Sequence, residues 1–88
     1  MTNESLIKEV IRLTRRGEIK WKREFCRVIK KGEILEELGY EARTRDLHFV
    51  VIPRMIFKSE LFIEDLRILT KRRTINELLD AIYEEENR

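Results

Sequence analysis

Apolar residues near the N-terminus recur with the spacing of one face of a helix. The stripe consists of Leu6, Ile7, Val10, Ile11 and Leu13. Intervals of three and four residues are typical of an amphipathic helix that packs against a core. Asn3 or Ser5 is suited to cap the start of this helix, and Gly17 is suited to end it.

The same periodicity is strongest near the C-terminus. The apolar positions there are Ile75, Leu78, Leu79, Ile82 and Tyr83. Thr74 stands just before this stripe and Glu77 follows three residues later, which is the pattern of a capping box. The sequence therefore predicts a C-terminal helix with Thr74 as its N-cap.

Between these helices, residues 40–58 have the pattern of β-strands. An alternating run, apolar on nearly both faces, consists of Leu47, His48, Phe49, Val50, Val51 and Ile52. Such a run predicts a central strand, or one that a partner covers. Pro53 lacks a backbone donor and is expected to end the ladder. The four residues from Arg54 to Phe57 are expected to begin the next strand or a bulge.

Two segments fit both a helix and a strand. In residues 19–31 a helix would place on one face Trp21, Phe25, Val28 and Ile29. This slightly favours a helix that ends at Gly32, followed by a short helical turn over residues 34–38. In residues 59–70, Ser59 as N-cap with acidic residues early and basic residues late favours a helix. The alternation of Leu61 and Ile63 favours a strand, and both interpretations stay open.

These patterns together predict a single α+β domain over residues 1–88. It has an N-terminal helix, a central short antiparallel sheet at about residues 40–58 and possibly beyond, and a C-terminal helix. The predicted core consists of Leu6, Val10, Leu13, Val51, Leu78, Leu79 and Ile82.

Composition adds expectations about the environment of the protein. Charged residues make up 41% of the chain, well above the usual quarter, and glutamine is absent. This is the compositional trend of thermophilic proteins. Cys26 is the single cysteine, so no disulfide can form within the chain and a reducing compartment is expected. No apolar run approaches membrane-spanning length and the N-terminus lacks a signal-peptide layout, so we expect a cytoplasmic protein without membrane contact.

The charge is unevenly distributed although the chain carries only +2 in total. Residues 12–31 hold nine basic and two acidic residues, a net charge of +7. The basic residues are Arg12, Arg15, Arg16, Lys20, Lys22, Arg23, Arg27, Lys30 and Lys31. The next stretch is acidic, with Glu33, Glu36, Glu37 and Glu41.

Clustered Lys and Arg residues are the electrostatic signature of phosphate binding. Trp21 and Phe25 lie within the cluster, and an exposed aromatic ring there can stack on a base. Two other interpretations stay open: a solvated charged face with both aromatic residues in the core, and neutralisation by residues 33–41 of the same chain or of a second copy. The sequence therefore predicts a binding surface for an acidic partner or nucleic acid over residues 12–31, including Trp21.

A homodimer is also expected from the sequence. The chain is short, its basic and acidic blocks are complementary, and a small monomer struggles to cover a strand that is apolar on both faces. Symmetric dimers are also the commonest oligomers.

No catalytic, metal or cofactor site is predicted. One Cys and one His cannot supply the four ligands of a zinc site, and the three glycines form no phosphate-binding pattern. Glu18 and Lys20 match the E-x-K end of a metal-dependent nuclease site, but no Asp precedes Asp46.

Three segments resemble the small HicA-type mRNA-cleaving toxins: LGY at 38–40, RDLHF at 45–49 and TINELL at 74–79. The resemblance covers about half of the chain. It implies a helix, three strands and a helix, with His48 as the catalytic residue. The Gly-Ser that usually precedes that histidine is Asp46-Leu47 here, which puts the role of His48 in doubt. The alternative function is therefore a small toxin-like or metal-dependent ribonuclease, using His48 or carboxylates such as Asp46 and Glu64.

The main prediction is a small non-catalytic binding protein that associates with itself.

Overall fold

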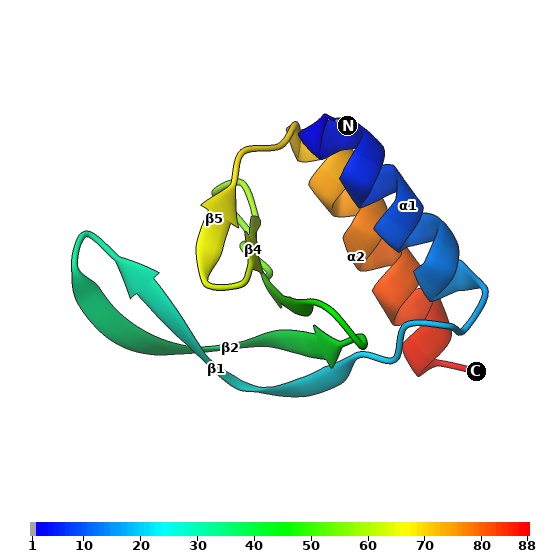
Figure 1. Cartoon of the computed structure of the whole chain (residues 1–88), viewed down its shortest axis with the longest axis horizontal. Helices are drawn as coiled ribbons and strands as arrows, with labels where there is room; N and C mark the ends of the chain where they lie inside the picture. The colour runs from blue at the N-terminus through cyan, green and yellow to red at the C-terminus, as the bar shows by residue number, and fades with distance from the viewer. Residues whose placement is uncertain (1) are drawn as a thin grey trace.

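A computed structural model describes residues 2–88 of the chain. Its elements are α1 (Asn3–Arg15), β1 (Lys22–Lys30), β2 (Glu33–Arg43), β3 (His48–Ile52), β4 (Glu60–Ile63), β5 (Leu66–Ile68) and α2 (Arg72–Glu86). The strands form one antiparallel sheet in the order of the sequence, β1-β2-β3-β4-β5 (Figure 1). The predicted α+β class, with a helix at each end of the chain and a sheet between them, is confirmed.

The two helices lie side by side and run in the same direction (Figure 1). Glu4 at the start of α1 accepts a hydrogen bond from Thr74 at the start of α2. At the other ends, Arg15 of α1 lies 3.6 Å from Glu84 of α2. Because both helices begin and end together, their apolar stripes combine into one surface that covers the sheet.

Five of the seven predicted core residues are confirmed as buried. Val10, Val51, Leu78, Leu79 and Ile82 are buried. Leu6 and Leu13 are partly buried and pack against the same cluster. Neither helix described over residues 2–88 is long and apolar enough to cross a membrane.

Helix α1 begins and ends with local hydrogen bonds. Thr2 is the N-cap, and its hydroxyl accepts from the backbone N–H of Ser5, so the prediction of Asn3 or Ser5 as cap was wrong. At the C-terminal end Gly17 has a φ of 75°, a left-handed conformation that glycine adopts without strain. The N–H groups of Gly17 and Glu18 bond to the carbonyls of Thr14 and Leu13, which satisfies the last turn.

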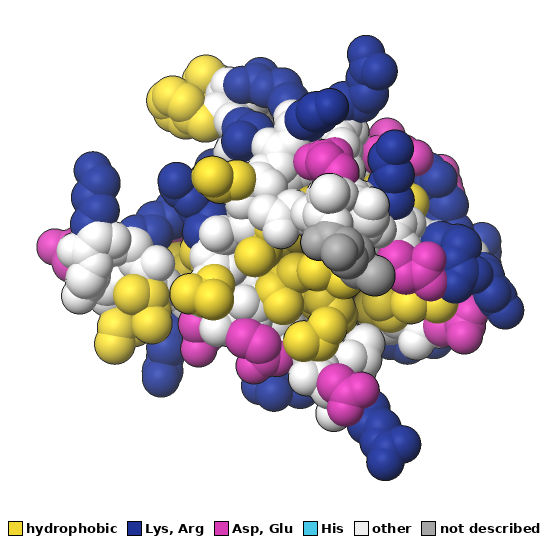
Figure 2. Space-filling model, turned by 45° about the horizontal axis from the view of Figure 1, so that its top comes forward, with side chains coloured by type: hydrophobic (Ala, Val, Ile, Leu, Met, Phe, Trp, Pro, Cys, Tyr) yellow, Lys and Arg dark blue, Asp and Glu magenta, His cyan; other side chains and the backbone are white. Residues whose placement is uncertain are grey.

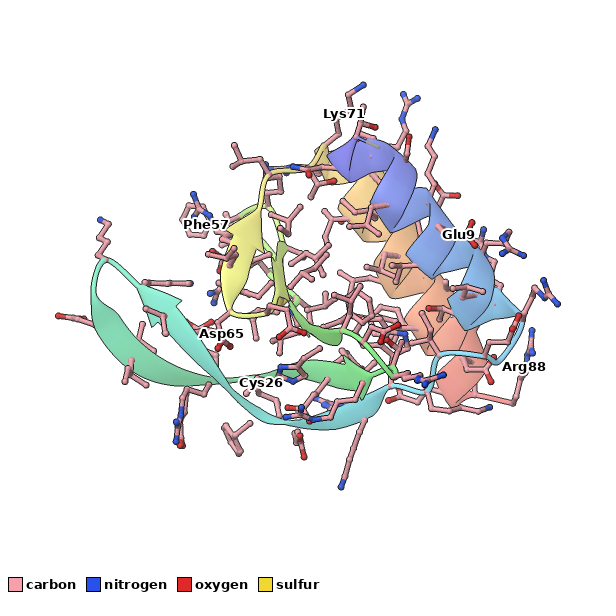
Figure 3. All side chains as sticks on the ribbon, viewed as in Figure 1. Glu9, Cys26, Phe57, Asp65, Lys71 and Arg88 are labelled. Carbon is pink, nitrogen blue, oxygen red and sulfur yellow. The ribbon has the colours of Figure 1, made fainter. Side chains whose placement is uncertain are left out.

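Helix α2 starts earlier than predicted. It begins at Arg72, and its N-cap Lys71 has no side-chain cap. Thr74 is therefore not the N-cap but lies inside the first turn. The oxygen acceptor comes instead from α1, since the Glu4 carboxylate accepts from the Lys71 N–H at 3.1 Å and from the Thr74 hydroxyl. In Figure 3, Lys71 lies where the starts of the two helices meet.

Residues 19–31 do not form the helix that was slightly favoured. They enter strand β1, in which Cys26 and Val28 are buried while their neighbours are half-buried or exposed. Strand β2 follows directly, so the predicted helical turn over residues 34–38 is wrong as well. Lys31 and Gly32, both with positive φ, form the two-residue turn of a hairpin.

The sheet extends further on both sides than residues 40–58. Residues 53–59 form a loop, so the prediction that Arg54–Phe57 begins a strand or bulge was wrong. Residues 59–70, for which both a helix and a strand were possible, contain two short strands, β4 and β5. Glu64 and Asp65 join them, with φ values of 51° and 68°.

Strand β3 is central and apolar on both faces, as predicted, but one chain covers both of them. Phe49 and Val51 face the helices in the main core. Val50 and Ile52 face the other way, where they join a second cluster with Cys26 and other residues of the β1–β2 hairpin. The hairpin therefore curls back over the sheet, and this reason for expecting a dimer does not hold.

Gly39 lies at the point where the hairpin meets β3. A Cβ atom at this position would be 2.4 Å from the carbonyl oxygen of Val51 and 2.7 Å from Cδ1 of Ile52. A residue without a side chain is required for this approach. Beyond it, residues 25–38 project away from the helices (Figure 1), and we call this part of the hairpin the arm.

Candidate interaction surface

The structure divides the predicted basic surface in two. Its helical part is engaged in ion pairs within the chain: Arg12 with Glu9, Arg15 with Glu77 and Glu84, Arg16 with Glu18, and Lys20 with Glu85. These pairs are largely solvent-exposed, and such pairs contribute about 1 kcal/mol or less to stability. Two of the four cations, Arg15 and Lys20, pair with α2, and none of the four pairs with residues 33–41.

The strand part of the basic surface is less engaged. Lys30 pairs with Glu37 and Glu60. Among the residues of the predicted basic stretch, four others have no carboxylate within 4.0 Å in the described part of the chain: Lys22, Arg23, Arg27 and Lys31. All four lie on β1 or on its turn, so the unpaired cations of the predicted basic stretch are on the hairpin.

Trp21 belongs to the core rather than to the surface. Its ring packs against the main cluster and lies 6.2 Å from the ring of Phe49. Its indole N–H donates to the Thr14 hydroxyl at 2.9 Å, and that hydroxyl in turn donates to the Val10 carbonyl. The indole thus ties the chain after α1 to the helix, so Trp21 is a partly buried structural residue rather than an exposed platform for a base.

The arm has one covered face and one uncovered face. Its inner face contributes Cys26, Val28 and Leu35 to the second cluster. Its outer face carries four apolar side chains that remain exposed: Phe25 at 72%, Ile34 at 64%, Ile29 at 47% and Leu38 at 43%. Phe25 stands opposite Leu38, and Ile29 opposite Ile34, so the four form two cross-strand pairs that are four residues apart along each strand.

Other apolar residues are exposed on the loop before β4 and beside β5. They are Met55, Ile56, Phe57, Leu66 and Leu69. Figure 3 shows Phe57 beside β5, away from the helices. Figure 2 shows apolar side chains reaching the surface at several places among Lys and Arg side chains. The outer face of the arm differs from these in being a regular two-stranded surface with known register.

A network of charged side chains holds the arm against the rest of the sheet. Glu60 Oε1 lies 2.6 Å from Lys30 Nζ on β1 and 2.6 Å from an Arg54 nitrogen in the loop after β3. Arg54 also pairs with Glu37 on β2. Burial raises the pKa of the Glu60 carboxyl, but hydrogen bonds from Lys30 and Arg54 outweigh it and leave the pKa below its ordinary value.

An open pocket of about 520 Å³ lies beside this network. Its walls include Lys30, Arg54, Arg67, Glu60 and Phe57. The cations Lys30, Arg54 and Arg67 all approach Glu60 within 3.5 Å. Since Glu60 attracts all three cations, the network accounts for their clustering without a ligand.

His48 lies at the start of β3 and is held by carboxylates. Its Nε2 is 3.0 Å from Glu41 Oε2, and its backbone N–H donates to Glu64 at 2.6 Å. Burial raises the pKa of Glu41, yet the contact with His48 and the nearby Arg43 leave it lowered. This contact joins β2 to β3.

Cys26 is buried on the inner face of the arm. Burial, with smaller contributions from Glu41 and Glu24, raises the pKa of its thiol to about 11. A thiol in this state is a poor nucleophile at neutral pH. Over residues 2–88, no three His, Cys, Asp or Glu side chains gather in a way that would hold a metal ion.

Known proteins offer no further guide to the function. No protein family matches this sequence, and no curated protein or solved structure is similar enough to it to count as a match. The outer face of the arm is therefore assigned on its own geometry. The sequence alone does not show that these apolar residues are exposed, because Phe25 and Ile29 are equally compatible with buried positions.

Proposed function

We propose that this protein is a small non-catalytic binding protein that associates with a second copy of itself through the outer face of the arm. The supporting observation is the exposure of Phe25, Ile29, Ile34 and Leu38 on one regular surface. Neighbouring apolar side chains that are exposed together mark interaction sites. Two-stranded surfaces of this kind pack face to face at about 10 Å.

The strength of the association follows from the exposed area. The exposed fractions of the four side chains amount to little more than two fully exposed side chains per subunit. At about 1.5–3 kcal/mol for each fully buried side chain, two subunits gain about 7–14 kcal/mol. Association costs about 4–15 kcal/mol in lost freedom. The gain exceeds the cost by about 10 kcal/mol at most, so the dimer should be weaker than nanomolar.

The test is the mass of the protein in solution as a function of concentration. Light scattering from about 1 to about 200 µM protein should show a transition from monomer to dimer. Phe25→Ser should shift that transition beyond the range, because it removes the largest exposed apolar side chain of the arm. Phe57→Ser is the matched control, since Phe57 is 75% exposed but lies outside the arm. A monomer mass for the wild-type protein at every concentration would contradict the proposal.

A second candidate function is binding of single-stranded nucleic acid by the same surface. Phe25 stands on the outer face between Arg23 and Arg27, two residues away on either side along β1. An exposed aromatic ring flanked by cations is the arrangement that stacks a base and neutralises its phosphates. Titration of labelled single- and double-stranded oligonucleotides at low and moderate salt tests this function. Binding should weaken in Phe25→Ser and become less salt-dependent in Arg27→Ala.

A further inference from the structure

The outer face of the arm has a simple arrangement. Three cross-strand pairs follow one another along it: Phe25 with Leu38, Arg27 with Glu36, and Ile29 with Ile34. The first residue of each pair lies on β1 and the second on β2. The surface is thus an apolar pair, a charged pair and a second apolar pair, with the positive charge on one strand and the negative charge on the other.

This arrangement distinguishes between the two ways in which two arms can pack face to face with two-fold symmetry. If the symmetry axis runs parallel to the strands, β1 of each subunit lies over β2 of the other. Arg27 then faces Glu36 of the partner subunit, and each apolar pair faces its equivalent. If the axis runs across the strands, β1 lies over β1, and Arg27 faces Arg27 of the partner subunit.

The electrostatic difference between the two arrangements is large. Opposite charges in contact attract and like charges repel, and both effects are stronger near a protein surface than in bulk water. The charged pair lies between two apolar pairs, where packing excludes water and weakens screening. With the axis parallel to the strands both charged contacts are attractive, whereas with the axis across the strands both are repulsive.

Both charged residues are available for such a contact. Arg27 and Glu36 are exposed, and within residues 2–88 neither has an ion-pair partner within 4.0 Å. They stand opposite each other in the strand register without forming an ion pair. Glu37 and Lys30, the neighbouring charged residues of the arm, point to its inner face and are engaged there.

We propose that two copies of this chain pack arm to arm about a two-fold axis parallel to β1 and β2, with Arg27 of each subunit paired with Glu36 of the partner subunit. This inference rests on the proposed function, because it specifies how the self-association takes place. The occupant of the outer face is a second copy, and the charged pair fixes the orientation of that copy.

Charge reversal tests the orientation. Arg27→Glu places two glutamates opposite each other at both symmetric contacts, and Glu36→Arg places two arginines there. Each single variant should dimerise at least tenfold more weakly than the wild-type protein in sedimentation or light scattering. The double variant R27E/E36R restores both attractive contacts and should return to within about threefold of the wild-type dissociation constant.

Mixing the two single variants tests whether the loss of association is electrostatic. In an equimolar mixture, every charged contact between an Arg27→Glu chain and a Glu36→Arg chain is attractive. The mixture should form a heterodimer at concentrations where each variant alone is monomeric. Arg72→Glu serves as a control, because Arg72 is exposed on α2, far from the arm along the chain. Circular dichroism melting of each variant verifies that the hairpin still folds.

The outcomes separate the orientation from the self-association itself. A wild-type protein that stays monomeric contradicts the proposed function. A wild-type dimer that both single variants leave unchanged overturns the proposed pairing of Arg27 with Glu36 of the partner subunit. A wild-type dimer that loses association in the single variants but does not recover in the mixture or in R27E/E36R also overturns the paired contact. Oligonucleotide binding by a monomeric wild-type protein, lost in Arg27→Glu, assigns the surface to nucleic acid instead.

Discussion

The close approach at Gly39 leads to a quantitative prediction about how the arm is positioned. In Gly39→Ala, the new Cβ would lie 2.4 Å from the Val51 carbonyl oxygen and 2.7 Å from Cδ1 of Ile52. The side chain of Ile52 can rotate, but the Val51 carbonyl is part of the sheet backbone. The hairpin must therefore move away from β3 or the sheet must distort.

The magnitude follows from the cost of overpacking. Inserting a methyl group into a packed interior costs about 1–3 kcal/mol, and contact with backbone places Gly39→Ala at the upper end. The loss of unfolded-chain entropy offsets about 0.4–1 kcal/mol. We expect a net loss of about 2 kcal/mol, which lowers the melting temperature of a domain of this size by about 8–16 °C.

Urea unfolding followed by circular dichroism measures the free energy directly. Gly32→Ala is the matched control, since nothing lies within 4 Å of its Cβ position and only its φ of 79° is unfavourable for alanine. That strain costs about 1–2 kcal/mol, and the lower entropy of the unfolded chain again offsets about 0.4–1 kcal/mol of this cost. If Gly39→Ala lost no more stability than Gly32→Ala, the steric account of the hairpin position would be refuted. An intact fold with weakened self-association would instead show that the arm moves as a unit.

Three further predictions concern single residues. Hydrogen bonds from Thr74 and the Lys71 backbone lower the pKa of Glu4, so its contribution to stability is present above its unfolded pKa and is lost as pH falls through the lower folded value. Urea midpoints measured from neutral pH into the acid range should therefore fall less in Glu4→Gln than in the wild-type protein. With its pKa raised from 9.0 to about 11, Cys26 should react with a thiol reagent about 100-fold more slowly at pH 8 in the folded protein than in urea, and equal rates would contradict its burial. Trp21→Ala should cost about 2–4 kcal/mol in the same urea assay through lost contact with Phe49 and the lost bond to Thr14, whereas an unchanged midpoint would indicate an exposed ring.

The helices could be recognised from the sequence because the periodic spacing of apolar residues that predicts each helix lies within a single short segment of the chain. Val10 and Ile82 recur in phase with neighbours three and four residues away, and both are buried as that phase requires. The start of α2 was misplaced because its acceptor is Glu4, a residue 70 positions away from Thr74. A capping interaction between two helices leaves no pattern in either of them.

Strand β1 was misjudged for a related reason. A half-buried strand shows alternation when its outer residues are polar, but here Phe25 and Ile29 are apolar and exposed. Together with the buried Cys26 and Val28 they give a nearly continuous apolar run, which has no clear period. The residues that obscured the strand are therefore the ones that make the outer face of the arm apolar. Strands β4 and β5 were ambiguous because they have only four and three residues, too few to establish a period.

By itself, the sequence determined the α+β class, the two helices, the central strand and most of the core, because these depend on the spacing of apolar residues over short distances. It also placed a basic stretch at residues 12–31, since charge is a property of composition. Only the tertiary structure decided which of those charges remain free, because Arg15 and Lys20 meet carboxylates of α2 that are distant in sequence. Likewise, Trp21 is partly buried because it packs against the main core, whereas Phe25 lies on the arm and is exposed. No local sequence pattern shows which parts of β1 the rest of the chain covers.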